Sequence, residues 1–272
     1  MVKGLAARCV RGLSGACAAL ALWHAPPASA AASDMPVHDE AHCARPALWV
    51  VGDADTTIFL FGTIHTHDGR AHWFDHAVRL AFERSDELVL ETIVPTELPR
   101  VAVAPGSGLA VAHRTIDTAR AAGLSVQLGA DLVLARAADA AAKPVIGLES
   151  FDEQLRMYQA LPGPTRPAIP AAAVSSPPAK DALAPFLRHM VESWNRGDAG
   201  PVETVVDTVK IQSPEAYRRL FSERNAAWAR WIGRRLDRPG VVFVAVGTGH
   251  LVGPDSVQAR LSQAGIHSAR IN

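Results

Sequence analysis

Two histidines stand directly after apolar segments that have the composition of buried strands. Segment 57–61 leads into Gly-Thr-Ile-His ending at His65, and segment 241–246 leads into Gly-Thr-Gly-His ending at His250. The carboxyl ends of parallel strands meet at one edge of a sheet, where ligands bind. We therefore expect His65 and His250 to share a metal ion, since neutral imidazole is the commonest metal ligand. The alternative is that each histidine caps its strand end through hydrogen bonds.

Two carboxylates follow strand-like segments in the same way. Glu91 comes after Leu88-Val89-Leu90, and Glu149 comes after segment 144–148. A carboxylate at the mouth of a core is costly unless it is paired, hydrogen-bonded or bound to a cation. We expect Glu91 to be a metal ligand or a general base, and Glu149 to be a further ligand. The alternatives are that Glu91 orients a turn or pairs with an arginine, and that Glu149 only ends its strand before a helix cap at Ser150.

Two histidines and a carboxylate with open coordination positions suit Zn²⁺, Mn²⁺, Co²⁺ or Fe²⁺. Such a cation lowers the pKa of bound water from about 15.7 towards 7 and so supplies hydroxide at neutral pH. The pattern therefore predicts a divalent metal site that activates water.

A basic residue interrupts the apolar side of the predicted helix 214–236. Arg224 lies within an apolar stripe, and Asn225 follows it. Arginine is rarely buried without an anionic partner. Either Arg224 forms a salt bridge with Glu91 or Glu149, or it holds a substrate carboxylate or oxyanion. We expect Glu91, Arg224 and Asn225 to be the catalytic residues.

Three more histidines follow the first strand end. His67 is a ligand only if the chain has already left the strand, because alternate strand residues point to opposite faces. His72 and His76 are expected in a loop or on a helix surface.

Alternating strand and helix patterns predict the fold that positions these residues. Segments 47–51 and 56–61 flank Gly52-Asp53-Ala54-Asp55 as a hairpin, and segments 87–91, 125–129 and 144–148 are predicted strands. The predicted helices are 73–84, 111–122, 131–142, 150–161, 187–196, 202–211, 214–236 and 256–264. Ser150 and Glu153 form a capping box, and Ser213 is the N-cap of the longest helix. The pattern indicates an α/β fold with a mainly parallel central sheet, an N-terminal hairpin, helices on both faces and a helical insertion.

The N-terminal 30 residues have the charged, apolar and small-residue order of a secretory signal, with cleavage after Ala30. A retained anchor is the alternative, although the apolar stretch is short for a membrane span. Residues 31–45 are expected to be flexible, and 46–272 to form one α/β domain with a Pro/Ala-rich loop at about 162–185. The predicted location is the periplasm or the extracellular space.

The composition excludes several classes of function. The chain has 27 basic and 27 acidic residues, and the signal-like segment holds three basic and no acidic ones, which leaves a formal charge near −3. No basic patch suggests nucleic-acid binding, and no other segment suits a stable membrane span. Cys43 is the only cysteine after the signal, so no internal disulfide is expected. Serine hydrolase, P-loop and His-Glu-x-x-His motifs are missing from the sequence.

The ordered set of motifs resembles the TraB/GumN family, which includes the animal Tiki proteins. The matching residues are Leu48-Trp49, Phe61 to His65, Leu88 to Glu91, Gly147 to Glu149, Gln154, Trp194 to Asp198, Arg224-Asn225, Trp228 and Val246 to Gly253.

This resemblance implies an erythromycin-esterase-like α/β fold and, for the Tiki branch, proteolysis that depends on a divalent metal (Mn, Co or Zn). It implies metal roles for His65 and His250, with Glu91 and Glu149 as candidate acids. We expect an exported metal-dependent hydrolase, a peptidase acting on a peptide or small-molecule substrate. The alternative is a non-catalytic periplasmic protein that binds peptides or acts in polysaccharide export. The segments between Pro95 and Gly129 and over 162–185 depart from the family pattern, and we expect them to shape substrate access.

Overall fold

The computed structural model describes residues 44–74, 76–97, 99, 101–161 and 182–272, which belong to one compact unit. The predicted signal, most of the segment 31–45 and most of the Pro/Ala-rich loop lie outside the described residues.

A six-stranded mixed sheet forms the centre of this unit. Its strands are β1 (Leu48–Gly52), β2 (Thr56–Thr63), β3 (Glu87–Leu90), β4 (Val145–Gly147), β5 (Gly240–Gly247) and β6 (Ser268–Arg270). The strand order is β4-β3-β5-β2-β1-β6, and the four strands from β4 to β2 are parallel. β1 and β2 form the predicted antiparallel hairpin, whose turn is fixed by Asp53 Oδ1 accepting from Thr56 N at 2.9 Å. The predicted α/β fold with a mainly parallel sheet is confirmed.

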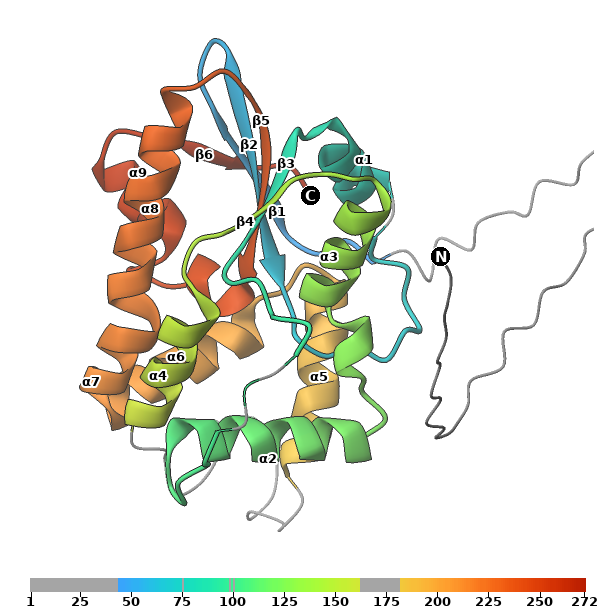
Figure 1. Ribbon diagram of the computed structural model, residues 1–272, viewed down its shortest axis with the longest axis vertical. Coiled ribbons are helices and arrows are strands. Elements are labelled where there is room, and N and C mark those ends of the chain that lie inside the picture. Colours follow the sequence, from blue (N-terminus) through green and yellow to red (C-terminus); the bar gives the residue numbers. More distant parts are fainter. Residues whose placement is uncertain (1–43, 75, 98, 100, 162–181) are drawn as a thin grey trace, which may run out of the picture. The chain divides into compact units, whose positions relative to one another are not determined.

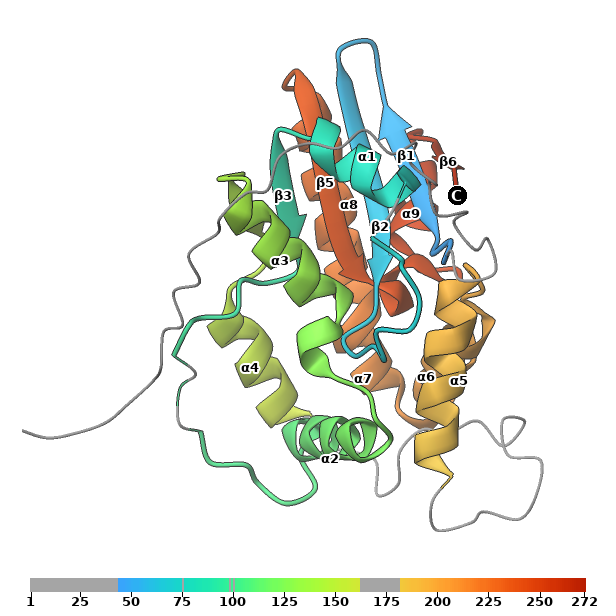
Figure 2. The same cartoon turned by 90° about the vertical axis from the view of Figure 1, so that its right-hand side faces the viewer.

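Helices cover both faces of the sheet (Figures 1 and 2). α1 (His76–Arg84) and α3 (Ala130–Ala140) lie on one face, and α8 (Glu223–Leu236) and α9 (Val257–Gln263) lie on the other. The alternation of side chains along β5 explains the two cores, because Phe243 and Ala245 pack with α1 and α3, while Val242, Val244 and Val246 pack with α8 and α9.

The remaining helices gather beyond the carboxyl ends of the parallel strands (Figures 1 and 2). They are α2 (Gly108–Ala121), α4 (Phe151–Ala160), α5 (Leu183–Asn195), α6 (Gly200–Gln212) and α7 (Pro214–Tyr217). α4 begins with the predicted capping box of Ser150 and Glu153. The helical layer thus covers the sheet edge at which the predicted site residues stand.

One predicted strand was wrong, and one predicted helix contains a turn that was not foreseen. Segment 125–129 is not a strand, because the Ser125 side chain accepts from Gln127 N and starts the 3₁₀ turn η2 (Val126–Leu128); only Ser125 pairs, in an isolated bridge with His67. The predicted helix 214–236 is capped by Ser213 as expected, but a π-helical segment, η4 (Arg218–Ser222), divides α7 from α8. π-helical turns of this kind are frequent at functional sites.

Candidate active site at the carboxyl edge of the sheet

The strand register brings the four strand-end residues to one edge. Thr63 of β2 lies opposite Gly247 of β5, and Leu90 of β3 lies opposite both Ala245 of β5 and Gly147 of β4. The two Gly-Thr motifs also contact each other directly, because Thr248 Oγ1 donates to the Thr63 carbonyl at 2.9 Å. His65, Glu91, Glu149 and His250 therefore all follow strands that end side by side.

Three of these side chains surround one point above Gly247. A methyl group on Gly247 would lie 3.0 Å from Glu91 Oε1, 3.9 Å from His65 Nε2 and 3.7 Å from His250 Cδ2. The glycine leaves this space open between two imidazole rings and a carboxylate. We call it the Gly247 point.

An aspartate at the start of α3 orients the His65 ring. Asp131 Oδ2 lies 2.7 Å from His65 Nδ1, and Asp131 Oδ1 accepts from Thr63 Oγ1 at 2.6 Å. The negative charge of Asp131 raises the pKa of His65 to about 9. The His65 side chain is nevertheless 70% exposed, so solvent screening limits the stability that this pair contributes. With Nδ1 bound to Asp131, Nε2 is directed to the Gly247 point.

His250 has the same motif but a buried setting. It lies in the short turn η5 (Thr248–Leu251), with 6% of its side chain exposed, and its ring centre is 4.4 Å from that of Trp228. Asn225 donates through Nδ2 to the Asp255 carbonyl, which leaves Oδ1 to accept from His250 Nδ1 at 2.6 Å. Because Nδ1 carries the proton, His250 Nε2 is a free acceptor, and it receives a hydrogen bond from Arg224 Nη1 at 3.0 Å.

Burial lowers the pKa of His250 to about 3, and the positive charges of Arg224 and His65 contribute, while Glu91 opposes them. His250 is thus neutral at physiological pH, which is the form that binds metals. Asn225 does not face the Gly247 point; it positions the His250 ring.

Glu91 is the buried carboxylate of the site. Its Oε1 accepts from the Gly247 amide at 2.6 Å, and its Oε2 accepts from Arg224 Nη2 at 2.8 Å and Gln154 Nε2 at 3.3 Å. Burial alone would favour the neutral acid, but the neighbouring cationic groups and the Gly247 amide lower the pKa of Glu91 to about 2. Glu91 is therefore ionised at any physiological pH.

Protein groups occupy all five N–H donors of Arg224. Nε and Nη2 donate to Glu149, Nη2 also donates to Glu91, and Nη1 donates to His250 Nε2 and to the Leu220 carbonyl within η4. Its guanidinium carbon lies 4.6 Å from the Trp228 ring centre. The carboxylate partners raise the pKa of Arg224 above its ordinary value, although burial opposes them. The salt bridge considered for Arg224 is present, to both carboxylates at once.

The donor types fit a divalent cation, although one contact competes with it. The Nδ1 of each imidazole is hydrogen-bonded to a side-chain oxygen, of Asp131 for His65 and of Asn225 for His250. Metal-binding histidines are usually oriented by such a hydrogen bond. Glu91 and Glu149 share one arginine, so this cluster carries one surplus negative charge. In the described residues, however, no three His, Cys, Asp or Glu side chains are already arranged around a metal position. Arg224 instead occupies the His250 Nε2 lone pair, which a metal would need.

Three residues of the site received no role from the sequence, although Gln154 was among the residues that match the family. Asp131 orients His65, Gln154 bridges Glu91 and Glu149 at 3.3 and 3.1 Å, and Tyr158 lies one turn after Gln154 on α4. Burial and the two glutamates raise the pKa of Tyr158, while Arg224 lowers it. An acidic residue in the first turn of a predicted helix was the available signal for Asp131. The Gln154 and Tyr158 positions depend on how α4 packs.

His67 is a structural residue. It is 1% exposed, its Nδ1 accepts from the Gly69 amide, and its Nε2 lies 3.0 Å from Asn195 Oδ1. The neighbouring Trp194 donates to the Gly62 carbonyl at 2.8 Å and so fixes the end of β2.

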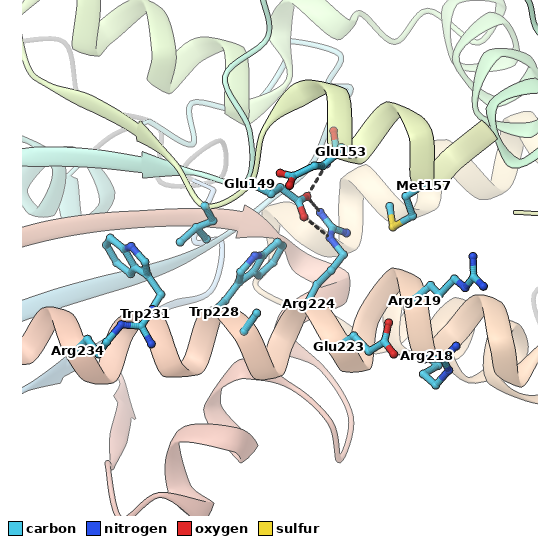
Figure 3. A pocket seen from close by; sticks show the side chains of 13 residues that line it. Glu149, Glu153, Met157, Arg218, Arg219, Glu223, Arg224, Trp228, Trp231 and Arg234 are labelled. Carbon is cyan, nitrogen blue, oxygen red and sulfur yellow. Dashed lines mark hydrogen bonds and ion pairs between the residues drawn. The ribbon is translucent and has the colours of Figure 1, made fainter. Parts of the chain in front are cut away.

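A cleft with a volume of about 710 Å³ adjoins the site between α4 and α8. Figure 3 shows Glu149 and Arg224 in its middle, Trp231 and Arg234 towards one end, and Arg218 and Arg219 towards the other. His65, Glu91 and His250 do not line it. The Glu149–Arg224 pair therefore forms the boundary between the cleft and the Gly247 point.

Comparison with known proteins gives a family assignment. The model of the TraB/PrgY/gumN family matches residues 47–104 and 98–270. Neither a curated protein nor a solved structure matches the chain. None of the helices in the part of the chain that the structure describes combines the length and hydrophobicity needed to cross a bilayer.

Proposed function

The chain belongs to the TraB/PrgY/gumN family, and we propose that it is an exported, metal-dependent hydrolase that cleaves peptides at the Gly247 point. The observation that carries the proposal is the convergence of His65 Nε2, the His250 ring and the Glu91 carboxylate around one open position. The choice of peptide substrates follows the resemblance of the two Gly-x-x-His motifs to those of the Tiki proteins.

His65, His250 and Glu91 would hold the cation, with Glu149 as a further acid. A bound Mn²⁺, Co²⁺ or Zn²⁺ would lower the pKa of a water molecule towards 7 and polarise the scissile carbonyl. Asp131 and Asn225 keep the two rings in the orientation that presents Nε2. The surplus negative charge of Glu91 and Glu149 favours cation entry.

Arg224 has a second role in this proposal. Use of His250 Nε2 as a ligand breaks its hydrogen bond with Arg224 Nη1 and so releases one guanidinium N–H. Because Arg224 also lines the cleft, the released N–H would be able to donate to the carbonyl oxygen of a substrate that reaches the Gly247 point, where negative charge develops. Arg224 thus stabilises the carboxylates in the free protein and orients substrate in the loaded one.

Export is proposed from the signal-like order of the first 30 residues. Mass spectrometry of protein from the periplasm or medium should give an N-terminus after Ala30. An intact N-terminus on membrane-bound protein would instead support a retained anchor.

Metal analysis of the untagged protein tests the central step. We expect about one equivalent of Mn²⁺, Co²⁺ or Zn²⁺, and loss of both metal and peptide hydrolysis in His65→Ala and His250→Ala. His113→Ala changes an exposed histidine of α2 and should retain both. Unchanged metal content in the two site variants would reject the proposal.

A second candidate is a non-catalytic protein that binds peptides or acts in polysaccharide export. It is favoured by one observation, that protein groups already use every N–H of Arg224 and the His250 acceptor. Tight ligand binding in excess chelator, without turnover after Mn²⁺, Co²⁺ or Zn²⁺ is added, would favour this function.

A further inference from the structure

The cleft between α4 and α8 has features of a binding site for an extended ligand. Its volume of about 710 Å³ lies within the usual range of ligand pockets, about 300–1,000 Å³. One wall comes from Leu148 and α4, including Met157, and the other comes from one side of α8, including Trp228 and Trp231. Its middle is formed by Glu149 and Arg224, and Arg224 also contacts the Glu91 carboxylate of the proposed catalytic site.

The charges along the cleft are unequal. Arg218 and Arg219 at one end are neutralised by Glu215 and Glu223. Arg234 at the other end is exposed, and none of the described acidic side chains pairs with it. Arg234 is therefore the uncompensated cation of the cleft, and it lies beside Trp231 in Figure 3.

The floor suits a peptide better than a sugar ring. Trp228 is 3% exposed and lies under the Arg224 guanidinium, so its face is not open for stacking. Leu148 and Trp231 are partly buried against the core beside it. Together with Met157 they offer an adaptable apolar surface for side chains, and the arginine beside it suits a carboxylate.

We propose that this cleft is the substrate groove and that it takes an extended peptide with a carboxylate, either a C-terminus or an acidic side chain, held by Arg234. The proposal rests on the proposed hydrolase function. Arg224 and Arg234 are ten residues apart on α8, which corresponds to about 15 Å along the helix and to four or five residues of extended chain. Cleavage is therefore expected about four or five residues before the carboxylate.

Binding in excess chelator tests the groove independently of hydrolysis. The probes are N-acetylated hexapeptides with a central leucine, made with a free C-terminal carboxylate or with a C-terminal amide. Titration calorimetry of the full chain should show that the carboxylate form binds about tenfold more tightly, because charge-assisted hydrogen bonds to arginine are strong. Arg234→Gln should abolish that preference and leave the amide form nearly unchanged.

Arg230→Gln is the matched control, because Arg230 is also exposed on α8 but does not line the cleft. Arg230→Gln should keep the tenfold preference for the carboxylate peptide. The groove proposal would be overturned if the unaltered protein bound both peptides with equal affinity. It would also be overturned if Arg234→Gln and Arg230→Gln lost the preference to the same extent. If an oligosaccharide such as cellohexaose bound to the cleft and the peptides did not, the assignment of a peptide ligand would be wrong.

The two proposals fail in different ways. If His250→Ala binds the carboxylate peptide and metal-loaded protein does not cleave it, the hydrolase fails and the groove stands. If metal-loaded protein cleaves both peptides equally and Arg234→Gln has no effect, the groove fails and the hydrolase stands.

Discussion

The two Gly-x-x-His strand ends share a motif but have opposite chemical settings. His65 is 70% exposed beside a carboxylate, and its pKa is raised to about 9. His250 is 6% exposed beside an amide and a guanidinium, and its pKa is lowered to about 3. The parent strands β2 and β5 are adjacent and parallel, so the strands themselves do not produce this difference.

The groups that produce it come from other elements. α3 supplies Asp131 to His65, and α8 supplies Asn225 and Arg224 to His250. The motif fixes where each ring stands, whereas its burial and the groups on the neighbouring helix fix its protonation state. His250 is ready to bind a metal at neutral pH, while His65 must first lose a proton.

Among the variants considered, Arg224→Met should have the largest effect on stability and on the difference between the two histidines. It leaves Glu91 and Glu149 without their buried cation, so we expect a loss of about 3–5 kcal/mol in the free energy of unfolding. The pKa of His250 should rise, because a repelling charge is lost while Glu91 remains. Urea denaturation and NMR titration measure the two effects.

Arg235→Met is the control for this variant. Arg235 is also buried on α8, but it pairs with Glu87, three turns away from the site. It should lower stability without moving the pKa of His250. A shift of that pKa in Arg235→Met, or unchanged stability in Arg224→Met, would contradict the assignment.

The two histidines should also affect stability in opposite pH ranges. The folded pKa of His250 lies below its unfolded value of 6.5, so its contribution is lost as pH falls from 6.5 towards 3, by on the order of 5 kcal/mol. Glu91 adds to this loss as pH falls from 4.5 towards 2. The raised pKa of His65 acts the other way: its smaller contribution is complete below pH 6.5 and is lost as pH rises through 9.

Measurement of the unfolding free energy across this pH range checks both the loss at acidic pH and the loss at alkaline pH. His250→Asn should flatten the loss between pH 6.5 and 4, and His65→Asn should change only the alkaline side. If His250→Asn lost stability at acidic pH as steeply as the unaltered protein, groups other than His250 would be the cause.

Filling the space between the rings should have a smaller effect on stability. In Gly247→Ala the new methyl group would lie 3.0 Å from Glu91 Oε1, so we expect a loss of about 1–3 kcal/mol together with loss of Mn²⁺ binding in calorimetry. Gly233→Ala on α8 is the control, since its methyl would meet Ile266 at an ordinary 3.5 Å and should stabilise the helix by about 0.5–1 kcal/mol. Normal Mn²⁺ affinity in Gly247→Ala would place any metal elsewhere.

The smallest change should come from Asp131→Asn. Loss of the charge lets the pKa of His65 fall towards its ordinary value and leaves His250 nearly unaltered, at a cost of about 1 kcal/mol or less. Asp117→Asn, which removes an exposed aspartate of α2, should leave both rings as they are. NMR titration of the two imidazoles would contradict this interpretation if His65 kept its raised pKa.

Much of this arrangement follows from the sequence. The β-branched segments, the hairpin turn, the Ser150 and Ser213 caps and the strand-end positions of the four site residues depend on local pattern and on the geometry of parallel sheets. Segment 125–129 was misjudged because the hydrogen bond of Ser125 with its own backbone outweighs strand propensity.

The remainder depends on tertiary packing. Asp131 meets His65, and Arg224 meets Glu91, Glu149 and His250, only after α3 and α8 have docked on the sheet. Burial and these contacts lower the pKa of His250 and raise that of His65, and no local sequence pattern encodes this difference.

The wide turn of η4 shapes one end of the cleft, because Arg218 and Arg219 lie within it. Its five residues hold one more position than a regular turn would need, so deleting one of them would make the helix continuous. Because the extra residue is absorbed within this one turn, such a deletion would leave α7 and α8 close to their present orientations. It would redirect the side chains of η4 itself, which include Arg218 and Arg219, while Arg224 and Arg234 on α8 stayed in place. Deletion of a single residue would therefore remodel one end of the groove and leave the other end unaltered.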